Sequence, residues 1–269
     1  MCRIGMIYAL YKYWKTRTEP KSSEPKFSEP KSSEPKFSEP KFSEPKFSEP
    51  REKSMSVSIP YVLSQNGVSR ADALGRRALD IVLSLVALLV LLVPLALVAL
   101  CIRLDSPGPV LFIQRRVGKN GHEFFVLKFR SMYLDAEQRL EILLGANERT
   151  GPVFKMRRDP RVTRIGRLLR KSSFDELPQL LNILRGEMSL VGPRPALPRE
   201  VALYSPEQHL RLSVTPGLTG LWQVSGRANL TFEQSMSLDL EYIERQSLAL
   251  NIVLIARTIP AVLTAHGAY

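Results

Sequence analysis

The chain has 269 residues and a mass of 30.4 kDa, which is enough for one buried domain with attachments but short for two large domains. Hydrophobic residues make up 44% and charged residues 24%, so the composition excludes wholesale disorder and an all-membrane protein. The formal net charge of +12 favours an anionic partner, and nucleic acid, lipid head groups and phosphorylated small molecules all qualify. Cys2, Cys101 and three histidines provide neither a disulfide framework nor zinc-ligand spacing, which favours a reducing compartment.

Residues 1–73 are predicted to form a disordered N-terminal extension. Residues 21–50 are six tandem copies of Lys-(Ser/Phe)-Ser-Glu-Pro, and the proline in each copy removes an amide donor and disfavours helix. Each copy carries one Lys and one Glu, so the repeat adds nothing to the net charge and is typical of a solvated spacer. A further hypothesis is that translation starts at Met55, which an intact mass beginning at Met1 would rule out.

The apolar run over residues 78–102 predicts contact with a membrane. Its 25 residues include one charge, Asp80. A straight helix of this length would measure about 38 Å, more than the ~30 Å hydrocarbon core. A single-pass helix and a re-entrant helix both fit that length. Pro94 would kink the helix, and arginines flank both ends, which the positive-inside tendency keeps on one side. We therefore predict a re-entrant membrane helix over residues 74–104 that breaks at Pro94.

Residues 105–269 are predicted to form a mixed domain in which helices predominate. The β-favouring runs 110–117 and 122–130 flank Asn120-Gly121, a strong hairpin signal. Helices are expected over residues 134–148, 163–171, 176–184, 206–213 and 232–246. The last apolar run, 248–263, is too short and polar to predict a membrane span. The predicted fold class is α/β, mostly α, with a re-entrant N-terminal membrane helix, a short β-hairpin and amphipathic interfacial helices.

A dense basic cluster lies between Lys155 and Lys171. Its eight basic residues and one acid, Asp159, give it a net charge of +7 out of the +12 of the whole chain. Such a run is typical of a solvated basic face or of an anion-binding site, and charge alone leaves both open. Because arginine forks bind phosphate oxygens in pairs, lipid head groups and phosphate-bearing substrates are natural targets.

Two adjacent carboxylates, Asp175 and Glu176, follow this cluster and support two interpretations. Ser173 with Glu176 three residues later matches a capping box, in which the carboxylates only stabilise the start of a helix. In the other interpretation Asp175 is a nucleophile toward phosphorus and Glu176 helps to hold Mg²⁺. Carboxylates form acyl-phosphates where cations offset the charge of the phosphate, and Mg²⁺ needs only one or two of them besides the substrate phosphates.

The run from Asp159 to Pro195, which includes DELPQLLNILRGEMSLVGPRP from Asp175 onward, resembles the signature of the bacterial sugar transferases, the monotopic phosphoglycosyl transferases. The resemblance covers about residues 74–263. It implies transfer of a sugar-1-phosphate from a nucleotide-diphosphate sugar, usually UDP-linked, to a polyprenyl phosphate such as undecaprenyl phosphate, with release of UMP. This reaction starts the assembly of exopolysaccharides and other glycans.

The resemblance also implies roles for particular residues. Asp175 would attack the sugar-proximal phosphorus to form a covalent phosphosugar, and Glu176 would bind Mg²⁺ together with it. The positions that match expected phosphate or nucleotide contacts are Lys128, Arg130, Arg170 and Arg194. Two positions depart from the family pattern, with Ser131 where Thr is common and Asn251 where Asp is expected.

The resemblance places residues 105–269 on the cytosolic face of the inner (cytoplasmic) membrane. The expected partners are the UDP-sugar donor, the polyprenyl phosphate acceptor and membrane lipids, with no nucleic acid and with homo-oligomerisation left open. The motif residues do not specify the sugar, although glucose or galactose is favoured.

Two other functions remain open on the sequence alone. A membrane-tethered nucleic-acid binder would use the basic cluster, with Trp222 and Phe174 as stacking residues. A non-catalytic scaffold for polysaccharide assembly would use Asp175 and Glu176 only as caps. The scaffold predicts that Asp175→Asn leaves function intact, because Asn caps a helix about as well as Asp.

Overall fold

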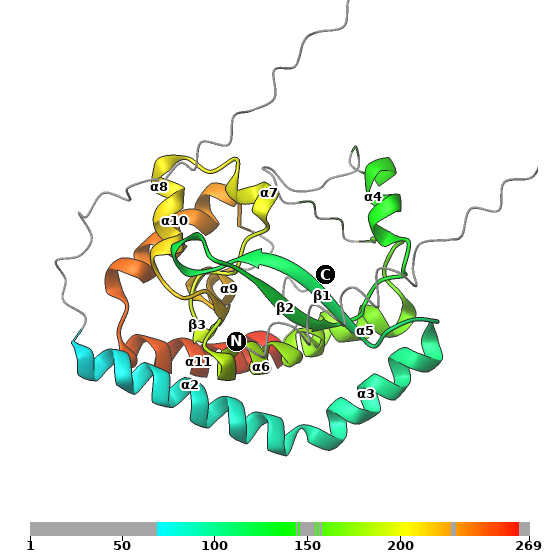
Figure 1. The fold of residues 1–269 in the computed structure, drawn as a ribbon, viewed down its shortest axis with the longest axis horizontal. Coiled ribbons are helices and arrows are strands. Elements are labelled where there is room, and N and C mark those ends of the chain that lie inside the picture. The colour runs from blue at the N-terminus through cyan, green and yellow to red at the C-terminus, as the bar shows by residue number, and fades with distance from the viewer. Residues whose placement is uncertain are drawn as a thin grey trace, which may run out of the picture. The chain divides into compact units, whose positions relative to one another are not determined.

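The computed structural model describes residues 69–143, 145, 154, 156, 158–226 and 230–263 (Figure 1). The expected repeat, the hypothetical start at Met55 and nearly all of the expected disordered extension lie outside the described residues.

Two helices that meet at a bend form the apolar N-terminal part of the described chain. Helix α2 spans Arg70–Val90, helix α3 spans Leu92–Asp105, and the chain turns by 63° between them. Pro94 lies in the first turn of α3, where its missing N–H cannot bond to the carbonyl of Val90. Among the described residues no single helix is long and apolar enough to cross a membrane, whereas α2 and α3 pass that test as a bent pair.

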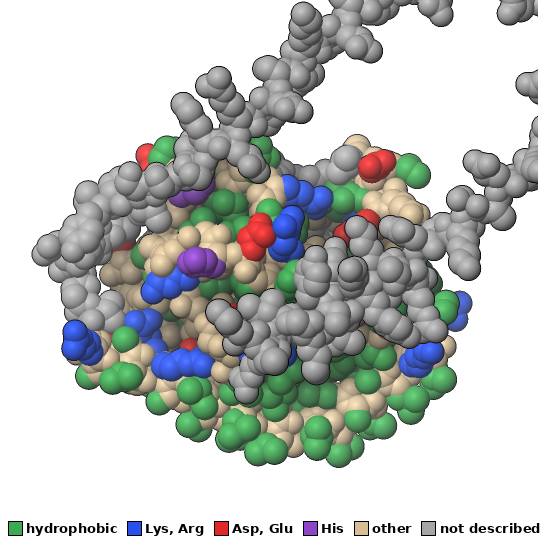
Figure 2. Space-filling view, in the orientation of Figure 1, with side chains coloured by type: hydrophobic (Ala, Val, Ile, Leu, Met, Phe, Trp, Pro, Cys, Tyr) green, Lys and Arg blue, Asp and Glu red, His purple; other side chains and the backbone are tan. Residues whose placement is uncertain are grey.

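The outer surface of α2 and α3 is unusually apolar. Large hydrophobic side chains are half or more exposed along both helices, and they form a band at the lower edge of the space-filling view (Figure 2). The most exposed of them are Leu74, Leu89, Val90, Leu92, Val93 and Leu104. An apolar surface of this length marks a site of membrane or protein contact.

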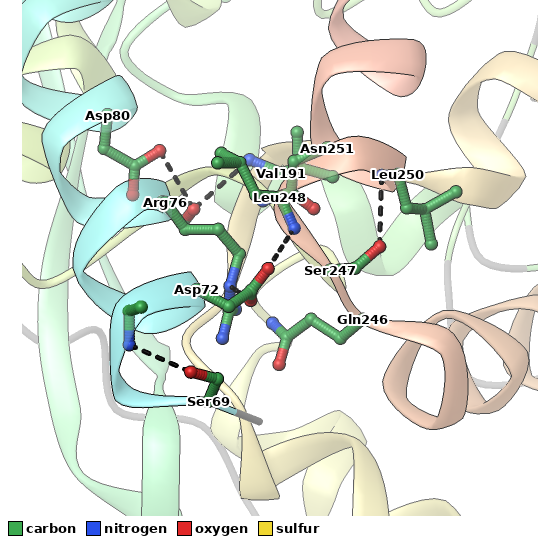
Figure 3. Close-up of polar contacts among 12 residues, drawn as sticks. Ser69, Asp72, Arg76, Asp80, Val191, Gln246, Ser247, Leu248, Leu250 and Asn251 are labelled. Atoms are coloured by element: carbon green, nitrogen blue, oxygen red, sulfur yellow. Dashed lines mark hydrogen bonds and ion pairs between the residues drawn. The ribbon is translucent and has the colours of Figure 1, made fainter. Parts of the chain in front are cut away.

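Polar contacts join α2 to the rest of the domain (Figure 3). Asp80 is buried and accepts hydrogen bonds from Ser189 Oγ and Leu190 N. Asp72 accepts from the backbone N–H of Leu248 at 2.7 Å, which satisfies a free donor at a helix start. Arg77 donates to the carbonyls at the end of a later helix, at residues 183 and 184. Asp80, the single acidic residue of the apolar run, therefore holds α2 against the rest of the domain.

The predicted hairpin is confirmed. Strands β1 (Leu111–Val117) and β2 (Glu123–Phe129) are antiparallel with Leu111 opposite Phe129, and the turn η2 (Lys119–Gly121) joins them. Asn120 has φ 57° and Gly121 has φ 79°, the left-handed conformations that this residue pair adopts readily.

A second, parallel pair of strands was not expected from the sequence. Strand β3 (Ser189–Val191) pairs with β4 (Gly217–Thr219), and each is three residues long. The two segments approach so closely that a Cβ atom on Gly217 would lie 2.0 Å from the backbone nitrogen of Gly192. Only glycine permits this contact, which fixes the start of the loop that follows β3.

Helices make up most of the remaining described chain, and most expected helices are present with altered bounds. They are α4 (Ala136–Leu143), α5 (Arg164–Ser172), η4 (Phe174–Gln179), α6 (Leu180–Arg185), α7 (Pro198–Val201), α8 (Pro206–His209), η5 (Leu210–Ser213), α9 (Leu221–Ser225), α10 (Phe232–Arg245) and α11 (Leu248–Leu263). The single helix expected over 176–184 is instead a six-residue 3₁₀ helix followed by α6. A core of Val126, Leu180, Ile183 and Met188 packs α6 against the hairpin, so η4 is held beside β2.

Candidate active site

The site begins where α5 ends and the chain reverses into η4. Ser173 adopts φ 59°, and its backbone N–H donates to the carbonyl of Arg170, which closes α5. Phe174 then packs against the buried cluster of Ile102, Phe129 and Leu169. This hydrophobic anchor fixes the start of η4, where Asp175 and Glu176 follow.

The capping-box interpretation of Ser173 and Glu176 is wrong. The Ser173 side chain makes no capping hydrogen bond, and the Glu176 carboxylate does not return to the backbone of Ser173. Glu176 Oε1 instead accepts from Lys128 Nζ at 2.8 Å and from Arg194 Nη1 at 3.0 Å. Tertiary contacts with β2 and with the loop after β3 therefore determine where this carboxylate lies.

The structure brings together five of the six residues named from the resemblance. Lys128 comes from β2, Arg170 from α5, Arg194 from the loop after β3, and the carboxylates from η4. Arg170 donates through Nε to Ser131 Oγ at 3.0 Å, and its charge acts directly on Asp175. Segments that lie up to 66 residues apart in the sequence thus place three cations around two anions.

Arg130 does not join this group. Its buried guanidinium donates to the carbonyls of Pro107, Ser106 and Ile102, and so holds the end of α3 and the turn after it. In a continuing strand, residues two apart point to the same face, so Arg130 would accompany Lys128. Strand β2 ends at Phe129, however, and Arg130 lies beyond it, where its side chain contacts the end of α3 instead.

The two adjacent carboxylates differ in their proton affinity. Burial and the negative charge of Glu176 together raise the pKa of Asp175 to about 6, against the opposing charges of Lys128 and Arg170. Burial would also raise the pKa of Glu176, but Arg194 and Lys128 hold that pKa well below its usual range. Among the described residues Asp175 has no hydrogen bond or ion pair, so one carboxylate is held by cations and its neighbour is left available for chemistry.

Comparison with known proteins identifies the family of this chain. The model of the family described as "Bacterial sugar transferase" matches residues 71–265. The chain belongs to the bacterial sugar transferase family.

Individual members of the bacterial sugar transferase family are similar over most of this chain. The exopolysaccharide production protein ExoY of Rhizobium meliloti is 38% identical over 225 residues, which cover 81% of this chain and 100% of ExoY. The UDP-glucose:undecaprenyl-phosphate glucose-1-phosphate transferase of Caulobacter vibrioides is 42% identical, covering 73% of this chain and 72% of that protein. The galactosyl transferase CpsE of Streptococcus agalactiae is 46% identical over 72% of this chain, but the match spans only 43% of CpsE.

The donor set of the site fits the Mg²⁺ that this family implies. The described residues contain no group of three or more His, Cys, Asp and Glu side chains that could hold a metal alone. Asp175 carries no partner in the described part of the chain, and Glu176 uses only Oε1 for its two cations. Since Mg²⁺ typically takes one or two carboxylates and completes its shell with water and substrate phosphates, Asp175 and Glu176 would suffice to hold it.

Three residues beside the candidate site were not singled out from the sequence. Arg116 donates to the carbonyl of Pro195, and Arg211 donates to the carbonyl of Arg194, so both hold the 193–196 loop. Gln179, at the end of η4, is buried beside Lys128 and Arg194. Arg116 belonged to a visible pair of arginines, but the other two gave no local signal because their contacts join distant segments.

Arg211 is itself fixed by a buried ion pair. Its Nη2 lies 2.7 Å from Asp239 Oδ2, its Nη1 donates to Tyr204 Oη, and the arginine and aspartate are 6% and 1% exposed. Burial raises the pKa of Asp239 to about 6, against the opposing charge of Arg211. The position of Arg194 is thus linked to a charge pair in the core.

Asn251, the second departure from the family pattern, has a structural environment. It is buried in α11, and its Oδ1 accepts a hydrogen bond from Tyr242 Oη at 3.0 Å. The same hydroxyl lies 3.1 Å from the carbonyl of Val191 in β3. Through Tyr242, the residue therefore joins α10 and α11 to β3.

Proposed function

We propose that the protein transfers a sugar-1-phosphate from a UDP-sugar to undecaprenyl phosphate, releases UMP, and uses a covalent aspartyl-phosphosugar intermediate on Asp175. The observation that carries the proposal is that the two neighbouring carboxylates differ in their partners. Glu176 is neutralised by Lys128 and Arg194, while Asp175 is free among the same cations. The names of relatives that act on undecaprenyl phosphate support the donor and acceptor.

In the first step an Asp175 carboxylate oxygen attacks the phosphorus bonded to the sugar. The bond between that phosphorus and the bridging oxygen breaks, and its electron pair leaves with UMP. A carboxylate can approach this anionic phosphorus only if cations reduce the repulsion, and Lys128, Arg170 and Arg194 supply them. With an Asp175 pKa of about 6, the nucleophile is mostly ionised at neutral pH.

In the second step a phosphate oxygen of the polyprenyl acceptor attacks the same phosphorus. The acyl-phosphate bond breaks, and Asp175 regains its carboxylate as the diphosphate-linked product forms. Mg²⁺ held by Asp175 and Glu176 would supply charge neutralisation for the donor diphosphate. Because its carboxylate is a weak base, Asp175 is a good leaving group in this step. The same side chain is therefore the nucleophile of the first step and the leaving group of the second.

The apolar surface of α2 and α3 supports a position at the membrane (Figure 2). We infer that the pair enters the cytosolic leaflet and returns to the same side, with the bend at Leu91 inside the lipid. Backbone bonds flank the bend, because Leu91 N–H bonds to the Ala87 carbonyl and Leu95 N–H to that of Leu91, which limits the number of polar groups exposed to lipid. Arg70 and Arg103 lie near the two ends, where head groups attract cations.

The competing functions fit the structure less well. Phe174 packs in a buried cluster with Ile102 and Leu169, so it does not offer a free face for base stacking. The scaffold hypothesis required Glu176 to act in a cap, and it instead pairs with two cations.

The test is UMP release by the full chain in detergent with Mg²⁺, undecaprenyl phosphate and one of several UDP-sugars, run beside Asp175→Asn. We expect lipid-dependent UMP release with one donor and a loss of at least 10³-fold in the variant. Release that survives in Asp175→Asn would contradict the covalent step, and no release from folded protein with any UDP-sugar would contradict the reaction class.

A further inference from the structure

Two of the three cations around the carboxylates are held by an ion pair, and the third is held in another way. Lys128 and Arg194 pair with the second carboxylate. Arg170 has no ion pair among the described residues, and the only hydrogen bond of its side chain there runs from Nε to Ser131 Oγ at 3.0 Å. Of the charges around Arg170, that of Asp175 acts on it most strongly. A serine hydroxyl, and not a carboxylate, therefore orients this guanidinium in the free protein.

Ser131 is itself fixed against the start of α5. It follows β2 and is 8% exposed. Its carbonyl accepts a hydrogen bond from Thr163 N–H at 3.1 Å. A Cβ atom on Gly166 would lie 2.0 Å from the same carbonyl oxygen, so only glycine permits this contact. The backbone of Ser131 therefore has little freedom to move along α5 or away from it.

Ser131 contacts α5 at two points that lie one turn apart. Gly166 packs against its backbone and Arg170 binds its side chain, and residues four apart lie on the same face of a helix. Arg164 and Arg167, by contrast, are exposed. The contact at Gly166 thus holds the serine hydroxyl opposite position 170 of the helix.

The hydrogen bond to Ser131 leaves most of the guanidinium of Arg170 for an anion. Arginine carries five N–H donors in one plane, and the serine takes the single donor on Nε. The four donors on Nη1 and Nη2 make no hydrogen bond among the described residues, and they suit phosphate oxygens. Because a free arginine side chain has many rotamers, fixing Nε removes freedom that the side chain would otherwise lose when substrate binds. A charge oriented in advance in this way stabilises a transition state most effectively.

We propose that Ser131 is a positioning residue, whose hydroxyl oxygen accepts the Nε–H of Arg170 and orients that guanidinium for the transfer of the sugar phosphate to Asp175. The inference rests on the proposed function for the reaction that it serves. Ser131 acts through Arg170 and does not itself contact the substrate.

The test changes the hydroxyl and leaves Arg170 in place. Ser131→Ala removes the acceptor, Ser131→Thr keeps an oxygen on the same carbon, and Ser131→Cys keeps a similar size with a weak acceptor in case the alanine variant does not fold. Ser106→Ala is the matched control, since Ser106 is similarly buried and contacts Arg130 through its carbonyl. UMP release is measured on the full chain in detergent with Mg²⁺, saturating undecaprenyl phosphate and a varied concentration of UDP-sugar.

We expect Ser131→Ala to lower kcat about tenfold and to change the KM for the UDP-sugar less than about twofold, because the oriented charge matters most in the transition state. Ser131→Cys should behave in the same way. Ser131→Thr should recover kcat to within about twofold, and Ser106→Ala should leave it unchanged. A purely structural role would lower the melting temperature of Ser131→Ala and leave the kcat of the folded protein unchanged.

A double variant tests whether Ser131 acts through Arg170. Arg170→Met alone should lower kcat by more than Ser131→Ala does, since it removes the charge as well as its orientation. Adding Ser131→Ala to Arg170→Met should then change kcat no further, because the group that the serine positions is already absent.

A second readout does not depend on turnover. The exchange of the Arg170 Nε–H with water is followed by nuclear magnetic resonance on the full chain with isotope-labelled arginine, and the signal is assigned by its loss in Arg170→Met. Exchange should be faster in Ser131→Ala than in the unaltered chain and slow again in Ser131→Thr.

Three results would overturn the inference. They are an unchanged kcat in both Ser131→Ala and Ser131→Cys, an equal loss of kcat from Ser131→Ala with and without Arg170, and equal exchange of the Nε–H in Ser131→Ala and the unaltered chain. Failure of the proposed function shows differently, as no UMP release by the unaltered chain with any UDP-sugar, and the exchange measurement then still tests the contact.

Discussion

Neutralising the two adjacent carboxylates should change stability in opposite directions. Asp175→Asn and Glu176→Gln each remove one negative charge from neighbouring positions of η4, so their effect on the wider electrostatic field is nearly the same. Only their local partners differ. Asp175 is desolvated with no partner among the described residues, whereas Glu176 is paired with Lys128 and Arg194.

The magnitude for Asp175→Asn follows from its pKa. The ordinary value of 3.8 is raised to about 6, and each pKa unit corresponds to 1.36 kcal/mol, so ionised Asp175 costs the fold up to about 3 kcal/mol. Asparagine removes that cost without leaving a broken ion pair. For a domain of this size 1 kcal/mol shifts the melting temperature by about 2–4 °C, so we expect Asp175→Asn to melt several degrees higher.

Glu176→Gln should lower the stability of the fold. It leaves the largely buried ammonium of Lys128 without its counter-ion, and removing one partner of a buried ion pair costs roughly 3–5 kcal/mol. We expect the melting temperature to fall by a similar number of degrees.

The assay is thermal unfolding of both variants and the unaltered chain in the same detergent, repeated from pH 4 to pH 8. The folded pKa of Asp175 lies above its unfolded value, so stability is lost as pH rises from about 4 to 6. The advantage of Asp175→Asn should therefore be small at pH 4, grow through that window and stay constant above it. A destabilised Asp175→Asn, or an advantage equal at pH 4 and pH 8, would refute the reasoning.

Three further predictions concern activity and the support of the site. The rate of UMP release should rise with pH and level off above a pKa of about 6, as Asp175 ionises, and a flat profile from pH 5 to 8 would contradict this assignment. Arg211→Met should lower the free energy of unfolding by about 3–5 kcal/mol, because it leaves Asp239 buried and unpaired. The double variant with Asp239→Leu should recover this stability. It should not recover kcat, since the hydrogen bond from Arg211 to the carbonyl of Arg194 is still missing. Arg130→Met should lower the melting temperature and leave the KM for the UDP-sugar unchanged, whereas a direct phosphate contact would raise that KM.

Elements with strong local signals could be predicted from the sequence. Asn120-Gly121 fixes the hairpin because both residues tolerate positive φ, and Thr231 with Gln234 caps α10 as its spacing suggests. The bent apolar helix pair also follows from a local feature, the proline at position 94.

Features that depend on distant contacts could not be predicted in this way. Strands β3 and β4 are three residues long and pair across a separation of 28 residues, so neither has a recognisable pattern of its own. The capping box at Ser173 was misleading because Lys128 and Arg194 outcompete the backbone for the Glu176 carboxylate.

The residues alone gave Asp175 and Glu176 two interpretations, and the resemblance to a known family favoured the catalytic one and named the cations around them. Charge identified a basic cluster, yet Arg161 in that cluster is buried against Asp159, while Arg164 and Arg167 are exposed. Of the described cations in that stretch only Arg170 appears among the charges that act on Asp175. Composition therefore indicated an anionic partner but could not separate structural arginines from those that face the carboxylates.

The most direct test of the central claim is the intact mass of the protein after mixing with a UDP-sugar and Mg²⁺ in the absence of lipid acceptor. We expect an adduct of one sugar phosphate that maps to the peptide containing Asp175, disappears on addition of undecaprenyl phosphate and is absent from Asp175→Asn. Formation of the lipid-linked product without any adduct, or an adduct on another residue, would contradict the covalent role of Asp175.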